Sequence, residues 1–526
     1  MNPKLHLEKA IALNPDYSEA YYKLGLLHKS SNDRKKAIEN FKKAVSLDKE
    51  FAEAECELAI ALSEDGDEET SRNHFLNSLE INPNYADAYF NYALLLVKLN
   101  DFEEAKNNFD KVTEIDQNYS KAYFNKAKLL TNADDFESAQ KNYETAIDID
   151  ENYVDAHYYM GKLLSGGVAT DKEGTIVDKT NLPEARKHFL RVLELEPGNS
   201  KANYNLGRIF LAENNLTKAK SFLTKSIKLN SRYSKAHYLL AFAHNKTENY
   251  SLAKKHLELS IKHESENPLG HYLLGVRLYS EENFDEAEIH LKKAIELDSD
   301  HAESHFYLAM ILRQQDDPNL AKKHFFRALE INPEYSLAYY ELAHHSEESG
   351  DLNEAKIHFQ KASDVDQNYA YAYFHLARIL QNPSEYNQAV RNFETALEID
   401  PRITECHFAF ANLLRKGERL ENDGTLVKEP DMKRAEYHLK SALKIDPRFY
   451  KAHFTLGLIL SERGEVQESF SYFEKAISIN PKYAEAHYHL AVLLMNESEN
   501  TKSNLKAKST TRKKTPVKAG KFKKSS

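Results

Sequence analysis

Apolar and polar positions alternate along this chain with the spacing of short helices. Between residues 86 and 119 the apolar or aromatic positions form two runs, first Tyr89, Tyr92, Ala93 and Leu96, then Phe102, Ala105, Phe109, Val112 and Ile115. Steps of three and four residues place each run on one face of a helix. Polar residues at 100–101 separate the runs, and polar residues at 116–118 follow the second. The pattern predicts two antiparallel helices joined by a short turn.

Small residues recur at a fixed interval, which is 34 residues except for two intervals of 46. The positions are Gly25, Ala59, Ala93, Ala127, Gly161, Gly207, Ala241, Gly275, Ala309, Ala343, Ala377, Ala411, Gly457 and Ala491. A fixed period of this length is the signature of stacked repeats, in which each unit contacts mainly its neighbours. The chain is therefore predicted to be an all-α solenoid and not a globule with a single core.

A second series of small residues accompanies the first. It consists of Ala37, Ser71, Ala105, Ala139, Ala185, Ala219, Ala253, Ala287, Ala321, Ala355, Ala389, Ala435 and Ser469. The distance between two packed helices depends on the side chains at their contact, so a small residue on each helix lets the backbones approach closely. We expect about thirteen hairpins, each closed by a pair of small residues with a structural role.

The turn after the second helix often contains proline, which cannot continue a helix. The positions are Pro83, Pro197, Pro333, Pro401, Pro447 and Pro481. With the 34-residue period and the two small positions, this pattern resembles the tetratricopeptide repeat family over residues 3 to about 496. The family's frequent Trp is absent, and Tyr or His stands in its place. The resemblance implies a right-handed α-solenoid superhelix, with a half-repeat at residues 1–17, a tandem array at 18–483 and a capping helix at 484–496.

Two units contain 12 extra residues between their helices, at about residues 165–182 and 415–432. The inserts align at an offset of 250 residues, which also relates units without inserts, so a block of seven units is predicted to have been duplicated. Glu-Gly and Asp-Gly steps beside Thr and branched apolar residues favour a short β-hairpin in each insert. The resemblance implies a superhelical turn of about seven or eight units, so the hairpins could form a docking edge. The alternative is a tolerated surface insertion inherited twice.

Composition agrees with a long helical chain, because 29% of the 526 residues are charged and Gly and Pro are scarce. No stretch approaches the roughly 18 consecutive apolar residues that a membrane span needs. The N-terminus lacks an apolar signal region, and the two cysteines, Cys56 and Cys406, lie in distant units. The sequence therefore predicts a cytoplasmic protein without a disulfide framework or a cysteine metal site.

The last thirty residues differ in charge from the rest. Residues 497–526 contain ten Lys or Arg and two Glu, a net charge of +8, so the chain's −10 leaves −18 on residues 1–496. This segment has no hydrophobic periodicity and is rich in Ser, Thr and Lys, which predicts a disordered basic tail. It could hold nucleic acid, an anionic membrane surface or the acidic repeats themselves. A solubilising tail is the alternative.

The resemblance also implies a binding surface, because family members line a concave groove with positions two, five, six and nine of the first helix. These positions share one face. Position five is aromatic in every unit but one, and cations gather at positions two and nine between residues 120 and 238. The predicted groove residues are Lys121, Phe124, Asn125, Lys128, Tyr158, Lys162, Lys201, Tyr204, Asn205, Arg208, Lys235 and Tyr238.

Cations, aromatic rings and amides together suit an extended acidic segment of a protein or peptide partner. The alternative is a solvated charged face whose aromatic residues pack between repeats. Two narrower readings of the resemblance fail. Position five never carries the Lys of a chaperone-binding carboxylate clamp, and the position-six asparagines typical of the O-linked N-acetylglucosamine transferases are limited to Asn91, Asn125 and Asn205.

Catalytic chemistry lacks the residues to carry it. No His-Glu-x-x-His, Gly-rich phosphate loop or Cys-x-x-Cys occurs, and fourteen of the 23 His recur with the repeat period. We expect no enzyme activity, no cofactor, no metal site and no small-molecule substrate. Two functional hypotheses remain. One is a protein-interaction scaffold, and the other is a targeting or adaptor subunit of a separate, for example glycosyltransferase-like, enzyme complex whose basic tail contacts nucleic acid or membrane.

Overall fold

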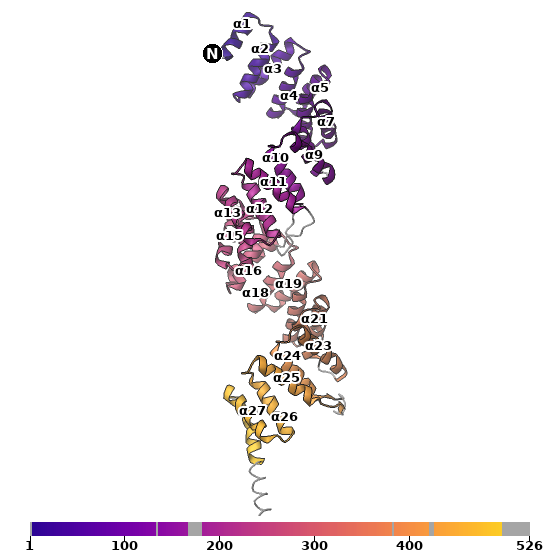
Figure 1. Ribbon diagram of the computed structural model, residues 1–526, viewed down its shortest axis with the longest axis vertical. Coiled ribbons are helices and arrows are strands. Elements are labelled where there is room, and N and C mark those ends of the chain that lie inside the picture. The colour runs from indigo at the N-terminus through magenta and orange to yellow at the C-terminus, as the bar shows by residue number, and fades with distance from the viewer. Residues whose placement is uncertain (1–2, 133–134, 167–180, 381–382, 420–425, 497–526) are drawn as a thin grey trace, which may run out of the picture. The chain divides into compact units, whose positions relative to one another are not determined.

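The computed structural model describes residues 3–132, 135–166, 181–380, 383–419 and 426–496, and these residues form an all-α solenoid of paired helices. The chain divides into two compact units, Met1–Arg277 and Leu278–Ser526. Helices follow one another along each unit in chain order (Figure 1). Each unit is described by itself.

The first unit begins with a lone helix, α1 (Pro3–Leu13), and continues as hairpins of a first and a second helix. The first helices are α2 (Ser18–Ser30), α4 (Ala52–Asp65), α6 (Ala86–Lys98), α8 (Ser120–Asn132), α10 (Val154–Leu164), α12 (Ser200–Ala212) and α14 (Ser234–Lys246). The second helices are α3 (Arg34–Leu47), α5 (Glu68–Ile81), α7 (Phe102–Ile115), α9 (Phe136–Ile149), α11 (Leu182–Leu195), α13 (Leu216–Leu229) and α15 (Tyr250–His263). The unit boundary falls within α16 (Pro268–Ser280).

The second unit repeats this arrangement. Its first helices are α18 (Ala302–Gln314), α20 (Ser336–Glu348), α22 (Ala370–Ile379), α24 (Thr404–Lys416) and α26 (Tyr450–Glu462). Its second helices are α17 (Phe284–Leu297), α19 (Pro318–Ile331), α21 (Leu352–Val365), α23 (Tyr386–Ile399), α25 (Met432–Ile445) and α27 (Val466–Ile479). A 3₁₀ helix, η1 (Pro383–Glu385), precedes α23, and residues 484–496 are helical.

The two small positions of a hairpin meet, as the sequence predicts. The Ser71 hydroxyl on α5 donates a hydrogen bond of 2.6 Å to the carbonyl oxygen of Ala59 on α4, and Ser469 donates one of 2.7 Å to that of Gly457. A large apolar residue of the second helix packs over the first-helix glycine, 16 positions later for Gly207 and, across the first insert, 28 positions later for Gly161. A Cβ atom on Gly207 would lie only 2.5 Å from the Cγ atom of Leu223. In this close contact, the backbone of the first helix therefore packs against a side chain of the second helix.

Polar residues begin and end the helices of each hairpin. Side chains of Asp or Asn accept a hydrogen bond from the backbone at the start of many second helices, as Asp67 does from the Thr70 amide at 3.2 Å. The turn between the helices contains a residue with positive φ, for example Asn100 at 63° and Gly350 at 85°. A left-handed residue at this place ends the first helix and reverses the chain.

The inserts agree with the expectation only in part. In the second insert, strands β1 (Glu418–Arg419) and β2 (Leu426–Lys428) pair antiparallel. The hairpin expected in the first insert falls on residues 167–180, which lie outside the described residues. Two hairpins are therefore not established, and the docking edge that they could form stays a prediction.

Histidine pairs join the first and second helices of hairpins in both units. The two Nδ1 atoms lie 2.9–3.0 Å apart in His157–His188, His237–His256, His305–His324 and His407–His438. Nε2 of the first histidine lies 3.1–3.3 Å from a backbone carbonyl oxygen six residues earlier. A carbonyl only accepts, so this Nε2 carries the proton, and the Nδ1 of the neutral ring accepts from the second histidine. The pairs are therefore structural, as their periodic recurrence predicts.

Burial and the neighbouring histidine lower the pKa of the second member of these pairs, to about 4 for His256, His324 and His438. Burial also lowers the pKa of His237, His305 and His407. The folded chain thus favours the neutral rings.

The first prediction concerns the close helix contact. Replacing Gly207 by Val should lower the free energy of unfolding by about 1–3 kcal/mol, because the added atoms must displace Leu223 in a packed contact. Urea denaturation followed by circular dichroism measures this change. The matched control is Gly198→Val, because a Cβ atom there meets nothing within 4 Å. Equal midpoints for the two variants would show that the small residue is not needed.

The second prediction concerns pH. An unfolded histidine has a pKa near about 6.5, so between that value and about 4 the unfolded chain binds more protons than the folded chain. Stability is therefore fully present above pH about 6.5 and decreases as the pH falls towards about 4. Denaturant midpoints measured across this pH range should show the decrease.

A variant that carries His237→Tyr and His256→Asn provides the control. It installs the residues that stand at the equivalent positions of another hairpin, Tyr89 and Asn108. Its stability should decrease less on acidification than that of the wild type. An identical decrease would exclude this pair as a source of the acid sensitivity.

Candidate functional site

The predicted groove positions lie on helices that touch one another. First helices of successive hairpins are in contact in the pairs α4 with α6, α8 with α10, and α12 with α14. Positions two, five, six and nine of these helices share one helical face. Within a unit, side chains of neighbouring repeats can therefore act on one ligand.

One cluster of the first unit surrounds Tyr159 on α10. Its ring lies 5.6 Å from that of Phe124, at 71°. The Nζ atoms of Lys128 and Lys162 lie 5.2 and 5.5 Å from the centre of the Tyr159 ring, within the range of cation–π attraction. Sequence reasoning named Phe124, Lys128 and Lys162 but missed Tyr159. Its place at position six of the first helix was the signal that could have found it.

A second cluster joins α10 and α12. The Asn205 amide lies 3.5 Å from the hydroxyl oxygen of Tyr158, and the Arg208 guanidinium lies 6.0 Å from the centre of the Tyr204 ring. The Tyr204 ring is 4.9 Å from that of Tyr233, in the turn before α14. These contacts give Tyr158 and Tyr204 a packing role as well as a place on the predicted surface.

The remaining predicted groove residues belong to neither of these two clusters. Lys121, Lys201 and Lys235 are exposed, whereas Tyr238 is only 7% exposed and belongs to the core. The amides of Asn125 and Asn205 donate hydrogen bonds of 2.9 Å to backbone carbonyls of their own helices. Part of the hydrogen-bonding capacity expected for a peptide is therefore used within the fold.

The cations of this surface share one electrostatic property. Among the residues that the structure describes, no carboxylate oxygen lies within 4.0 Å of the side-chain nitrogens of Lys121, Lys128, Lys162, Lys201, Arg208 or Lys235. Other cations of the same unit are paired, as Arg186 is with Glu213 at 2.6 Å. Within the described part of the chain these six cations thus form no ion pair, although the exposed Asp155 stands at position two of α10 and residues 1–496 carry a net negative charge.

The second unit contains a pocket of about 1340 Å³ on the same helical positions. Positions two, five, six and nine of α22 and α24 line it, namely Tyr371, Phe374, His375, Arg378, Glu405, Phe408, Ala409 and Asn412. The pocket is also lined by residues at the base of the second insert, namely Gly417, Pro430 and Met432. Another pocket, of about 1040 Å³, lies off these positions in the first unit, on α3, α5 and positions four and seven of α4.

The 250-residue offset relates this pocket to the predicted surface. Phe374 corresponds to Phe124, Arg378 to Lys128 and Phe408 to Tyr158. Ala409, however, corresponds to Tyr159, whose ring lies against Phe124 and beneath two lysines. A methyl group in place of a phenol ring leaves room between the corresponding side chains. Sequence reasoning placed the site in the first unit only, because cations gather there.

Charged groups at the pocket are largely paired. Arg378 donates to both carboxylate oxygens of Glu347 at 2.5 and 2.7 Å. Arg415 lies 3.6 Å from the Glu462 carboxylate, and its buried Nε has no hydrogen-bond partner among the described residues. The pocket therefore combines aromatic walls with two paired arginines, unlike the cationic surface of the first unit.

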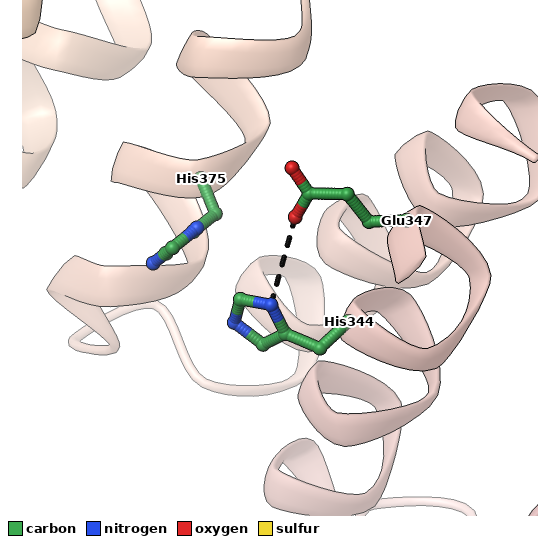
Figure 2. Close-up of side chains that lie close together, drawn as sticks. All are labelled: His344, Glu347 and His375. Atoms are coloured by element: carbon green, nitrogen blue, oxygen red, sulfur yellow. Dashed lines mark ion pairs between the residues drawn. The ribbon is translucent and has the colours of Figure 1, made fainter. Parts of the chain in front are cut away.

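Three potential metal ligands meet at the edge of this pocket. His344 and Glu347 extend from α20, and His375 extends from α22 across from them (Figure 2). One donor atom from each lies within 4.8 Å of the others, and Nδ1 of His344 is 3.6 Å from a Glu347 oxygen. Sequence reasoning expected no metal site, because these residues form no contiguous motif and are 28–31 positions apart across the two helices.

Several sequence expectations are not addressed by this arrangement. The basic tail, residues 497–526, lies outside the described residues. Its expected contact with nucleic acid or an anionic surface, and the adaptor hypothesis that depends on it, stay predictions. In the part of the chain that is described, no helix combines the length and the apolar character that a bilayer span requires.

The fold defines a class of protein, the α-helical repeat protein. The tetratricopeptide repeat family matches this chain at residues 18–51, 74–107, 120–153, 177–228, 272–336, 337–369, 370–403 and 450–483. These matches cover more than half of the sequence, and the chain belongs to this family. Repeats of this kind bind other proteins, and they do not in general carry catalysis.

Solved structures give a weaker likeness. The chain is similar to Cut9–Hcn1 of the APC/C (14% identity, covering 94% of this chain and 100% of that one, TM-score 0.39). It is also similar to yeast Tom70 (15%, 95% and 99%, TM-score 0.34). A third is YrrB, described as a TPR protein with an unusual peptide-binding site (24%, 35% and 95%, TM-score 0.32). A comparison with curated proteins found no match. These scores add nothing to the family assignment.

Proposed function

We propose that this protein is a non-catalytic scaffold whose first unit binds an extended acidic segment of a partner along α8, α10, α12 and α14. The observation that carries the proposal is the set of six cations, Lys121, Lys128, Lys162, Lys201, Arg208 and Lys235, that have no carboxylate partner within 4.0 Å among the described residues.

Unpaired cations favour an acidic ligand for two reasons. A partner carboxylate need not break an existing ion pair, such as that of Arg186 with Glu213, before it binds. The complementary charge also speeds encounter and disfavours basic partners. Each exposed charge contact contributes about 0.2–1 kcal/mol, so several contacts along the surface are needed for useful affinity.

Aromatic side chains supply the apolar part of the proposed contact. Tyr159, between Lys128 and Lys162, offers a ring face on which a partner side chain or peptide plane can stack. The amide oxygen of Asn125 remains available to accept from peptide N–H groups, because the bond to its own helix uses the amide nitrogen, whereas Asn205 is only 5% exposed. Charge and stacking together suit an extended segment better than a folded surface.

The third prediction tests this surface by charge reversal. The variant carries Lys128→Glu, Lys162→Glu and Arg208→Glu. An array of synthetic peptides, graded from acidic to basic, is first used to select an acidic peptide that the wild type binds. This peptide is then labelled, and fluorescence anisotropy measures its binding. The triple variant should bind this peptide at least about tenfold more weakly, because three lost contacts of about 0.5 kcal/mol approach the 1.4 kcal/mol of a tenfold change.

The matched control reverses the same amount of charge on second helices. Lys141, Lys228 and Lys262 are exposed on α9, α13 and α15, and their replacement by Glu should leave binding close to that of the wild type. If both triple variants lost the same affinity for the peptide, the loss would be due to net charge and not to this surface. If the wild type bound acidic and basic peptides equally well, the proposal of an acidic partner would be wrong.

A further inference from the structure

We propose that His344, Glu347 and His375 form a binding site for a divalent transition metal ion, for which Zn²⁺ is the ion best suited to the donors. Two imidazoles and one carboxylate are a donor set that zinc accepts, with a further position left for water or another ligand. The proposal is independent of the acidic-peptide surface, which lies in the other unit.

The donors are close to binding distance. Their donor atoms lie within 4.8 Å of one another, and His344 Nδ1 is 3.6 Å from Glu347. In a tetrahedral zinc site with bonds of about 2.0–2.1 Å, neighbouring donor atoms lie about 3.3 Å apart. Side-chain rotation on two packed helices can close this difference. The ring centres of His344 and His375 are already 4.5 Å apart, with the planes at 78°.

One further carboxylate lies close to these donors. Glu341 lies near His344, but its carboxylate is engaged by Arg313 at 2.5 Å and does not enter the donor set.

Arg378 is the cation that these acceptors now share. It contacts both oxygens of Glu347, and its terminal nitrogen is 3.1 Å from Nδ1 of His375. The acceptors thus already converge on one positive group. The side chain of Arg378 is 42% exposed, so it can turn into solvent when a metal ion takes its place. This competition predicts that removal of the guanidinium strengthens metal binding.

The three donors are not required by the repeat. At the 250-residue offset the corresponding residues are Leu94, Val97 and Asn125. The same hairpin packing is therefore built there without a metal ligand. The histidine pairs differ from this group, because in each pair one ring donates to a backbone carbonyl and the two rings bond to each other. His375 and Arg378 also line the pocket, so a bound ion would remain accessible to an external donor.

The fourth prediction is tested with the untagged full-length chain and Co²⁺, whose visible spectrum reports nitrogen and oxygen coordination, followed by displacement with Zn²⁺. The wild type should bind a single equivalent of metal. Replacing either His344 or His375 by Ala should weaken binding at least about tenfold, since even the loss of a residue behind a ligand costs about 10–100-fold. Arg378→Gln should bind several-fold more tightly than the wild type.

Two comparisons make the result decisive. The His237→Tyr, His256→Asn variant changes two histidines outside the group and should leave the Co²⁺ spectrum unchanged. Circular dichroism of each variant confirms that its helices are intact. A Co²⁺ spectrum that survives His375→Ala unchanged would overturn the proposal, as would absence of binding by both the wild type and Arg378→Gln. Neither result would affect the acidic-peptide surface.

Discussion

Each hairpin of this chain depends on a contact between two small residues, one on each helix. Ser71 and Ser469 reach the facing backbone carbonyls at 2.6 and 2.7 Å, which is possible only where no side chain separates the helices. A large apolar residue such as Leu223 then covers the small residue from the second helix. Repetition of this contact sets the same helix spacing in every hairpin, and each hairpin buries its remaining apolar face against the next.

A constant spacing leaves one face of each first helix free to vary. Position five packs inside the hairpin, as Phe124 does with its ring 6.0 Å from that of Tyr143, so positions two, six and nine have more freedom to change. In the first unit they carry unpaired cations over aromatic rings, as at Lys128 and Tyr159. In the second unit they form a pocket in which Arg378 is engaged by Glu347. One scaffold therefore presents two chemically different surfaces.

Residues that correspond at the 250-residue offset show how small changes separate these surfaces. Ala409 stands where the first unit has Tyr159, and the smaller side chain opens space between the surrounding rings. His375 stands where the first unit has Asn125, and it meets His344 and Glu347 of the preceding repeat. Neither change touches the small residues that close the hairpins. New chemistry could therefore arise on this face at little cost to folding.

The sequence by itself determined the repeat and the paired helices, because helical periodicity and a recurring 34-residue interval are local properties of the chain. The groove positions came from the family resemblance and stay a prediction. The sequence also identified Phe124, Lys128 and Lys162 as neighbours on one face. It did not identify the pocket of α22 and α24 or the group of His344, Glu347 and His375. Those depend on side-chain rotamers, on whether Ala409 or a tyrosine fills a given space, and on which acid pairs with which cation. Only the tertiary structure decides such contacts, because they join residues of different repeats across distances that no local pattern records.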